Sequence, residues 1–204
     1  MRIKAISAES RDLKTLEAIN EEAIPANERC ALSDMIATGA DVLSIEEGNE
    51  PVGFIAIRHY QNLVYLAYFA VRKDLRSKGI GGRALMSLIK LYPEKQIVAE
   101  HESPDIHCSN YATQIRRKEF YLRNGFFETK WHTHYDGTEF EIICSRPDFD
   151  ADEFKAFSDY IATIVSDHIP NPFSVIAPCS SSPAAYTPDS SPSGRRSGPA
   201  PSVG

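Results

Sequence analysis

The segment from Phe69 to Leu85 combines residue types that can hold a phosphate group. An apolar run, Leu63–Val71, leads into a short basic turn containing Gly79 and Gly81, and a helical pattern begins directly after it. The first N–H groups of a helix have no partner within it, and the helix dipole there favours negative charge. Because glycine lacks a Cβ, an anion can approach the main chain closely. The segment therefore predicts a phosphate-binding loop.

The glycine spacing excludes two common phosphate-binding loops. No stretch supplies the Walker A pattern Gly-x-x-x-x-Gly-Lys-Ser/Thr, and Gly79-Ile80-Gly81-Gly82 does not fit the dinucleotide fingerprint Gly-x-Gly-x-x-Gly. The turn after the buried strand instead carries the pattern Arg76-x-x-Gly79-x-Gly81, with Lys78 and Arg83 as further positive charges. The pattern favours a small polyanionic ligand.

A second stretch places polar side chains along one face of an expected helix. Gln114, Arg117 and Tyr121 are separated by three and four residues, so they share a face that can line one ligand channel. Gly125 is expected to end this helix as a left-handed cap, and Phe126 begins the next strand.

Two carboxylates alternate along a third segment, an expected strand over Gln96–Glu102. Glu100 and Glu102 face the same side of it, where one carboxylate would raise the pKa of the other and make it a better base. The alternative is a solvated strand face. His101 points to the opposite side, where a structural role is expected.

In combination, the loop and the later helix resemble the GNAT acetyltransferases. The acyl-CoA pyrophosphate loop of that family reads Arg/Gln-x-x-Gly-x-Gly/Ala, and its later helix ends in Phe/Leu-Tyr-x-x-x-Gly-Phe/Tyr, like Phe120-Tyr121-Leu122-Arg123-Asn124-Gly125-Phe126 here. The resemblance covers residues 1 to about 145. It implies an acetyl-CoA-dependent N-acetyltransferase that transfers an acetyl group to a primary amine by direct attack in a ternary complex.

The resemblance also implies roles for individual residues. The main chain at Phe69, Ala70 and Val71 would pair with the pantetheine arm and polarise the thioester carbonyl. Tyr121 matches the family's general acid, and Glu100 or Glu102 would be the base, directly or through water. Gln114 and Arg117 stand where the family often has Asn and Ala. The expected coenzyme-binding residues are Phe69, Ala70, Val71, Arg76, Ser77, Lys78, Gly79, Ile80, Gly81, Gly82, Gln114, Arg117 and Tyr121.

The element pattern predicts an α/β (α+β) domain over residues 1–145. The order β-α-α-β-β-β-α-β-α-β-β indicates a twisted, mixed and mostly antiparallel sheet flanked by helices, which is the GNAT architecture. Residues 146–177 form an extension whose amphipathic helix, Asp152–His168, is expected to pack on the domain. The Pro/Ser/Gly-rich segment 178–204 is expected to be disordered.

Composition narrows the expected partners. The 204 residues carry a net charge of −6, which argues against nucleic-acid binding and against a tRNA-acetylating enzyme of this fold. No apolar run approaches the roughly 20 residues that span a bilayer, so no membrane contact is expected. Four scattered cysteines indicate reduced thiols in a cytoplasmic protein. The His and Cys spacings fit no metal site, so acetyl-CoA is the one expected cosubstrate.

The identity of the acceptor stays open at this point. The sequence is compatible with a small-molecule or a peptide amine, and with a monomer or a homodimer. The alternative function is a non-catalytic module of the same fold that binds or senses acyl-CoA.

Overall fold

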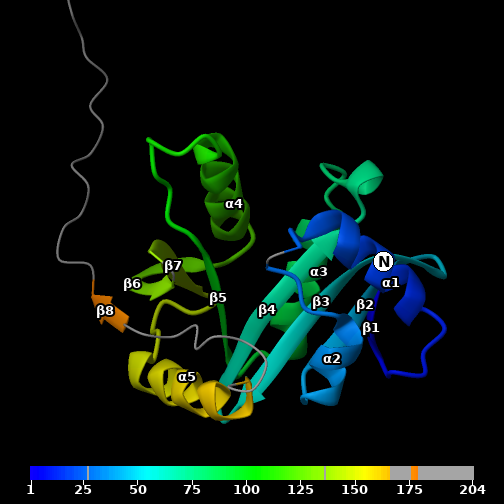
Figure 1. The fold of residues 1–204 in the computed structure, drawn as a ribbon, viewed down its shortest axis with the longest axis horizontal. Coiled ribbons are helices and arrows are strands. Elements are labelled where there is room, and N and C mark those ends of the chain that lie inside the picture. The colour runs from blue at the N-terminus through cyan, green and yellow to red at the C-terminus, as the bar shows by residue number, and fades with distance from the viewer. Residues whose placement is uncertain (27, 136, 166–175, 179–204) are drawn as a thin grey trace, which may run out of the picture.

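The computed structural model describes residues 1–26, 28–135, 137–165 and 176–178. These residues form one eight-stranded sheet with the strand order β1-β2-β3-β4-β5-β7-β6-β8 (Figure 1). The strands are β1 (Arg2–Ile6), β2 (Asp41–Glu47), β3 (Glu50–Tyr60), β4 (Leu63–Val71), β5 (Gln96–Glu102), β6 (Phe127–Tyr135), β7 (Thr138–Cys144) and β8 (Ile176–Pro178). The helices are α1 (Leu13–Ala23), α2 (Leu32–Ala37), α3 (Ile80–Leu91), α4 (Tyr111–Arg123) and α5 (Ala151–Val165), with a 3₁₀ turn η1 (Lys73–Leu75).

The predicted fold class is confirmed. All neighbouring strands are antiparallel except β4 and β5, which are parallel. Helices α3 and α4 pack on one face of the sheet, and α1 and α2 pack on the other. Alternation along a strand explains why Phe54 and Ile55 are both fully buried, because they enter the cores on opposite faces.

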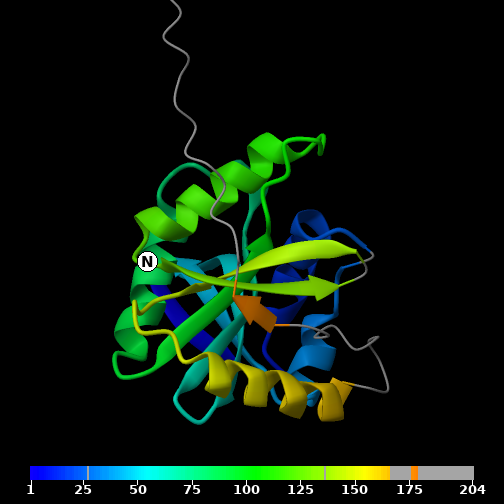
Figure 2. The same cartoon turned by 90° about the vertical axis from the view of Figure 1, so that its left-hand side faces the viewer.

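Helix α5 belongs to the folded domain, as its apolar pattern predicts. Phe154, Phe157 and Ile161 pack against Leu63 and Ile142 in a third apolar cluster. Figure 2 shows α5 and α4 on opposite sides of the strands β6 and β7. The predicted helix ended at His168, and residues 166–168 lie outside the described part of the chain.

Strand β8 is a feature that the sequence did not predict. Its three residues pair antiparallel with β6, so that Ile176 lies opposite Thr133 and Pro178 opposite Trp131. Pro178 was expected to begin the disordered segment, but its place in a strand depends on a long-range partner that local composition does not reveal. Residues 179–204 lie outside the described part of the chain.

The parallel strands β4 and β5 pair along only part of their length. Leu63–Tyr65 lie opposite Gln96–Val98, and no pairing continues beyond these residues. On the other side of β4, Ile57 of β3 lies opposite Leu66 whereas Ala56 lies opposite Tyr68, so Ala67 is an extra residue in β4. Such a bulge bends its strand and reverses which main-chain groups face each neighbour. The sheet is therefore open between the ends of β4 and β5.

The packing of α5 makes a prediction about stability. Replacing Phe157 with alanine removes a fully buried ring, and we expect the free energy of unfolding to fall by about 3–5 kcal/mol in urea denaturation. Lys155→Ala, on the exposed side of the same helix, is the control and should change it by about 0.5 kcal/mol or less. Equal effects of the two substitutions would mean that α5 does not stabilise the domain.

Candidate functional site

The predicted phosphate-binding loop lies between β4 and α3. Gly79 is the N-cap residue of α3 with φ of 77°, a left-handed conformation that glycine adopts without steric cost. Ser77 is also left-handed, with φ of 62°. No side chain caps the helix. The first turn of α3 therefore presents its main-chain N–H groups without a side-chain acceptor, as an anion-binding helix terminus requires.

The next two glycines in the chain allow helix packing. A Cβ on Gly81 would lie 3.2 Å from the Cζ of Phe120, and one on Gly82 would lie 2.5 Å from the Oδ1 of Asn124. Both neighbours belong to α4 or its C-terminal cap. We expected Gly81 to give an anion access to the main chain, and its surroundings give it a second role, because it lets the first turn of α3 approach α4.

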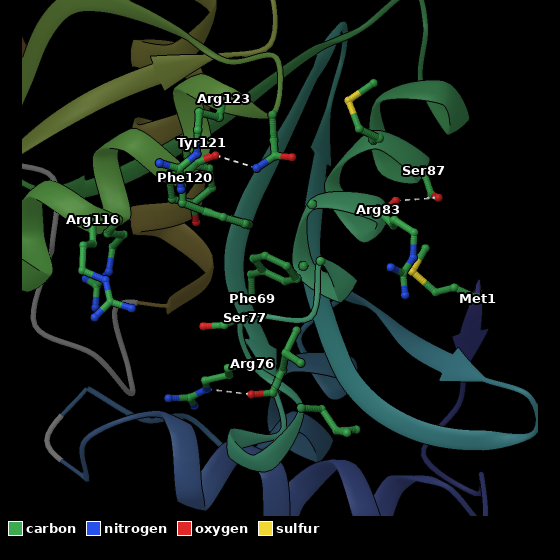
Figure 3. A pocket seen from close by; sticks show the side chains of 18 of the residues that line it. Met1, Phe69, Arg76, Ser77, Arg83, Ser87, Arg116, Phe120, Tyr121 and Arg123 are labelled. Carbon is green, nitrogen blue, oxygen red and sulfur yellow. Dashed lines mark hydrogen bonds between the residues drawn. The ribbon is translucent and has the colours of Figure 1, made fainter.

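A cleft of about 1190 Å³ opens between α3 and α4. Figure 3 shows Arg116, Phe120 and Tyr121 of α4 on one side, Arg83 and Ser87 of α3 on the other, and Phe69 of β4 between them. The cleft brings together most of the residues that the sequence assigned to the coenzyme, namely Phe69, Val71, Arg76, Ser77, Gly79, Gly81, Gly82, Arg117 and Tyr121.

The other assigned residues do not line the cleft. Ala70 and Ile80 are buried in the cores on opposite faces of the sheet, and Lys78 is exposed. The N–H of Arg72 donates to the carbonyl of Val52 on β3, so alternation turns the main chain of Ala70 toward β3 as well. It leaves the main-chain groups of Phe69 and Val71 facing the gap beside β5. Of the three predicted main-chain contacts, two thus have the required orientation.

Gln114 occupies a different place from the one expected. Its side chain is only 2% exposed, and its Oε1 accepts a hydrogen bond from the N–H of Asp105 at 2.9 Å. It thereby holds the segment before α4 and lines a second cleft of about 570 Å³, together with Glu102 and Glu139. The spacing of three and four residues placed Gln114 near the face of Arg117 and Tyr121, but could not show that the preceding loop covers that end of the helix.

Several cationic residues of the cleft were not singled out from the sequence. Arg116 and Arg123 of α4 and Lys90 of α3 line it in addition to the predicted arginines. The basic run 116–118 is a sequence signal for Arg116, although not all three residues of the run line the cleft. Lys118 instead forms ion pairs with Glu128 and Glu141 at 2.5 and 2.7 Å. The cleft thus concentrates positive charge on a protein with a negative net charge.

Tyr121 lies at the inner end of the cleft with its ring almost fully buried. The ring is 9% exposed, stacks on His101 and meets Phe126 edge-on. Burial raises the pKa of Tyr121 to about 12, and the nearby Arg117 acts in the opposite direction. Among the described residues, the hydroxyl has no hydrogen-bond partner. A neutral phenol with a free O–H is therefore available as a donor inside the cleft.

The two candidate bases have different surroundings. Glu100 is partly buried and accepts hydrogen bonds from the hydroxyls of Tyr65, Thr133 and Tyr135. Burial raises the pKa of its carboxyl, and the three hydroxyl donors lower it. Glu102 accepts a hydrogen bond from the Nδ2 of Asn110 at 3.1 Å and lines the second cleft. The raised pKa of Glu100 thus arises from burial, whereas we expected it to arise from a neighbouring carboxylate.

His101 points to the face opposite Glu100, as expected. It is buried, and its Nδ1 lies 3.0 Å from the carbonyl oxygen of Glu102. In the described part of the chain, no cluster of three or more His, Cys, Asp or Glu side chains could hold a metal ion. No helix in the described residues has the length and apolarity needed to cross a membrane.

Comparisons with known proteins agree with this geometry. The family model of the acetyltransferase (GNAT) domain matches residues 38–128. The sequence has no significant match among curated proteins. Among solved structures, an acetyltransferase of the GNAT family from Bacteroides thetaiotaomicron is similar with a TM-score of 0.66 and 23% identity, over 81% of this chain and 98% of that one.

Two further structures share the fold at lower identity. A GNAT family acetyltransferase from Elizabethkingia anophelis with acetyl-CoA bound has a TM-score of 0.51 and 17% identity, over 70% of this chain and 95% of that one. The aminoglycoside 6'-N-acetyltransferase from Enterococcus faecium has a TM-score of 0.54 and 17% identity, over 74% and 100%. Residues 38–128, which include both sequence motifs, therefore match the GNAT acetyltransferase domain, and the predicted resemblance is confirmed.

Because the phenol of Tyr121 is buried, we expect the free energy of unfolding to depend on pH in the alkaline range. The pKa of tyrosine is about 10 in an unfolded chain, so the folded state favours the neutral form. This contribution is complete below pH 10 and is lost as the pH rises toward 12. Between these values we expect the wild type to lose about 2–3 kcal/mol more unfolding free energy than Tyr121→Phe. Parallel pH curves for the two proteins would contradict the burial of this hydroxyl.

Proposed function

We propose that the protein is an N-acetyltransferase that transfers an acetyl group from acetyl-CoA directly to a primary amine. The observation that carries the proposal is the content of one cleft. It holds the N-terminus of α3, the unpaired edge of β4 and the hydroxyl of Tyr121. In this proposal, they bind the three parts of the cosubstrate, namely the diphosphate, the pantetheine arm and the thioester sulfur.

The basic loop is the proposed diphosphate site. N–H groups at the start of α3 would donate to the phosphate oxygens, and the helix dipole would favour their charge. Arg116, Arg117 and Lys90 line the cleft without an ion-pair partner among the described residues. They are therefore available to the phosphate of coenzyme A that is not part of the diphosphate. Arg83 is already paired with Glu47 at 2.8 Å, which makes it a less available partner.

The main chain of β4 is the proposed binding edge for the pantetheine arm. Phe69 and Val71 have no strand partner on the β5 side, where an amide-containing arm could pair as a further strand does. An N–H from this edge would also polarise the thioester carbonyl, since it can donate to the oxygen on which negative charge develops.

The transfer itself would use both faces of the sheet. Glu100 takes one proton from the ammonium, whose pKa near 10.4 otherwise keeps it protonated. The amine nitrogen then forms its bond to the carbonyl carbon, and the carbon–sulfur bond breaks. Tyr121 donates its proton to the departing sulfur, and the second amine proton returns to Tyr121 through solvent. None of the cysteines described lines the cleft, which favours direct transfer over an acetyl-enzyme.

The fold alone does not distinguish a small-molecule amine from a protein or peptide amine as the acceptor. The solved structures of this fold include aminoglycoside acetyltransferases and ribosomal-protein-alanine acetyltransferases, which are named for a small-molecule and a protein acceptor. The acceptor must therefore be sought in the residues of this chain.

The decisive experiment measures coenzyme binding and turnover separately. Purified protein is titrated with acetyl-CoA by calorimetry, and a panel of amines is screened for thiol release. We expect Tyr121→Phe to lower the transfer rate about 10²–10³-fold, because a general acid contributes on that order, and to leave acetyl-CoA affinity unchanged. Full turnover by this variant would exclude Tyr121 as the acid, and binding without turnover by the wild type would favour the non-catalytic sensor.

The loop makes a separate prediction about coenzyme affinity. Gly79→Val should weaken acetyl-CoA binding at least tenfold, because a side chain strains the left-handed cap and obstructs the phosphate site. Gly137→Val is a matched control, since Gly137 has the same φ of 77° but lies in the turn before β7, outside the α3–α4 cleft. Both variants should lose about 1–2 kcal/mol of stability. Unchanged affinity in Gly79→Val would show that the loop is not the diphosphate site.

A further inference from the structure

The second cleft lies at the end of β5, between the loop that precedes α4 and the turn that precedes β7. Its volume is about 570 Å³. The carboxylates of Glu102, Asp105 and Glu139 line it, and the one titratable base among its described lining residues is His107. A concave site lined by one sign of charge attracts the opposite charge. This cleft therefore favours a cationic ligand, in contrast to the basic cleft between α3 and α4.

The three carboxylates differ in how many of their oxygen lone pairs are already used. Glu139 is shared by two histidines of β6, at 3.0 and 3.1 Å. Asp105 accepts two hydrogen bonds from its own loop. Glu102 accepts one among the described residues, from the Nδ2 of Asn110 at 3.1 Å. Because a carboxylate has about four lone-pair sites, Glu102 is the most available of the three for a cation.

A buried amide adds a group of a different kind to this cleft. The side chain of Gln114 is only 2% exposed, yet it lines the cleft. Its Oε1 accepts the hydrogen bond from Asp105, whereas its Nε2 has no hydrogen-bond partner among the described residues. A buried donor without a partner is costly, and an oxygen atom of a ligand would satisfy it. The cleft thus combines acceptors for a cation with a donor for a carbonyl oxygen.

Exposed apolar side chains form another part of the lining. Ile106 is 73% exposed and Tyr111 is 36% exposed, and Pro104 belongs to the same loop. The methylene stem of a Lys or Arg side chain can cover such groups while its charged end reaches a carboxylate. A polyamine has no carbonyl oxygen for Gln114, and an aminoglycoside has little apolar surface. A peptide with a basic side chain provides the cation, the carbonyl and the apolar stem.

The cleft lies within reach of the proposed reaction. Glu102 follows Glu100 by two residues on the same side of β5, which is about 7 Å along the strand. Gln114 precedes Tyr121 by about two turns of α4, or about 10 Å along the helix. An extended peptide spans the shorter distance with two residues. A basic side chain one or two residues from the reacting amine can therefore enter the cleft.

We propose that this second cleft binds a Lys or Arg side chain of a peptide acceptor. Glu102 is the partner of the cation, and the Nε2 of Gln114 donates to a main-chain carbonyl of the peptide. The inference rests on the proposed function and names the substrate class of the same reaction. It gives Glu102 a role in specificity, whereas Glu100 is the base in the proposed reaction.

Two pairs of peptides test the cleft without any transfer. One pair is Ala-Arg-Arg-Ala amide and acetyl-Arg-Lys-Arg amide, which carry an α-amine and a lysine amine, respectively, as their single amine. Each has a counterpart with citrulline in place of arginine, which keeps the shape of the side chain and removes its charge. The peptides are titrated by calorimetry into protein saturated with coenzyme A. We expect at least one arginine peptide to bind at least tenfold more tightly than its citrulline counterpart.

A double-mutant cycle with this peptide separates direct contact from damage to the fold. Glu102→Gln should weaken the arginine peptide at least tenfold and the citrulline peptide at most about twofold, because only the arginine loses a charged partner. Glu94→Gln is the matched control, since Glu94 is an exposed carboxylate before the other end of β5 and lines neither cleft. It should bind both peptides as the wild type does, and thermal melting verifies the fold of each variant. Equal effects of Glu102→Gln on the two peptides would overturn the role of Glu102.

Turnover distinguishes a role in specificity from that of a base. For the arginine peptide we expect Glu102→Gln to raise KM at least tenfold and to leave kcat within about threefold. A large loss of kcat with unchanged KM would make Glu102 the base and overturn the inference.

Spermidine and kanamycin, titrated under the same conditions, test the substrate class. We expect both to bind at least tenfold more weakly than the arginine peptide, and tighter binding of either one would overturn the peptide class. Binding of the arginine peptide that depends on Glu102 but leads to no turnover would support the cleft and refute the enzymatic function alone. Turnover of other amines without measurable binding of either arginine peptide would overturn the inference and leave the function intact.

Discussion

The loss of pairing between two parallel strands is the constraint on which the site depends. The extra residue Ala67 bends β4 while β3 keeps its hydrogen bonds to both sides of the bulge. The sheet stays continuous at Tyr65 and opens beyond it. A closed sheet would bury the main chain of Phe69 and Val71 in a ladder. The open one leaves these groups available and lets side chains from both faces approach one point.

The opening divides the candidate chemistry between the two faces of the sheet. Tyr121 lies on the face of α3 and α4, next to the basic loop. Glu100 lies on the face of α5. Burial raises the pKa of both groups, so the phenol of Tyr121 stays protonated and the carboxylate of Glu100 becomes a stronger base. Tyr121 is thereby suited to act as the acid and Glu100 as the base. In the proposed reaction, the amine and the leaving sulfur would therefore occupy opposite sides of the carbonyl.

Local patterns predicted those parts of the molecule that local forces determine. The bounds of β4 and β5 agree with the prediction because turns flank apolar runs, and Gly125 is left-handed as expected. Contacts between distant segments could not be predicted. The hydroxyls of Tyr65 and Tyr135 beside Glu100 come from 35 residues away in the chain, and β8 also pairs with a distant strand. The bond that takes Gln114 out of the cleft comes from a loop residue nine positions before it, where no periodic pattern indicates the path of the chain. The roles of Gly81 and Gly82 likewise require knowledge of where α4 lies.

The position of β8 has a consequence for the integrity of the sheet. Without it, β6 would be an edge strand with unsatisfied main-chain groups, which is a template for association with other chains. Ile176 covers β6 opposite Thr133, the residue whose side chain reaches Glu100. A segment far from Glu100 in the chain thus shields the strand that supports this carboxylate from competing partners.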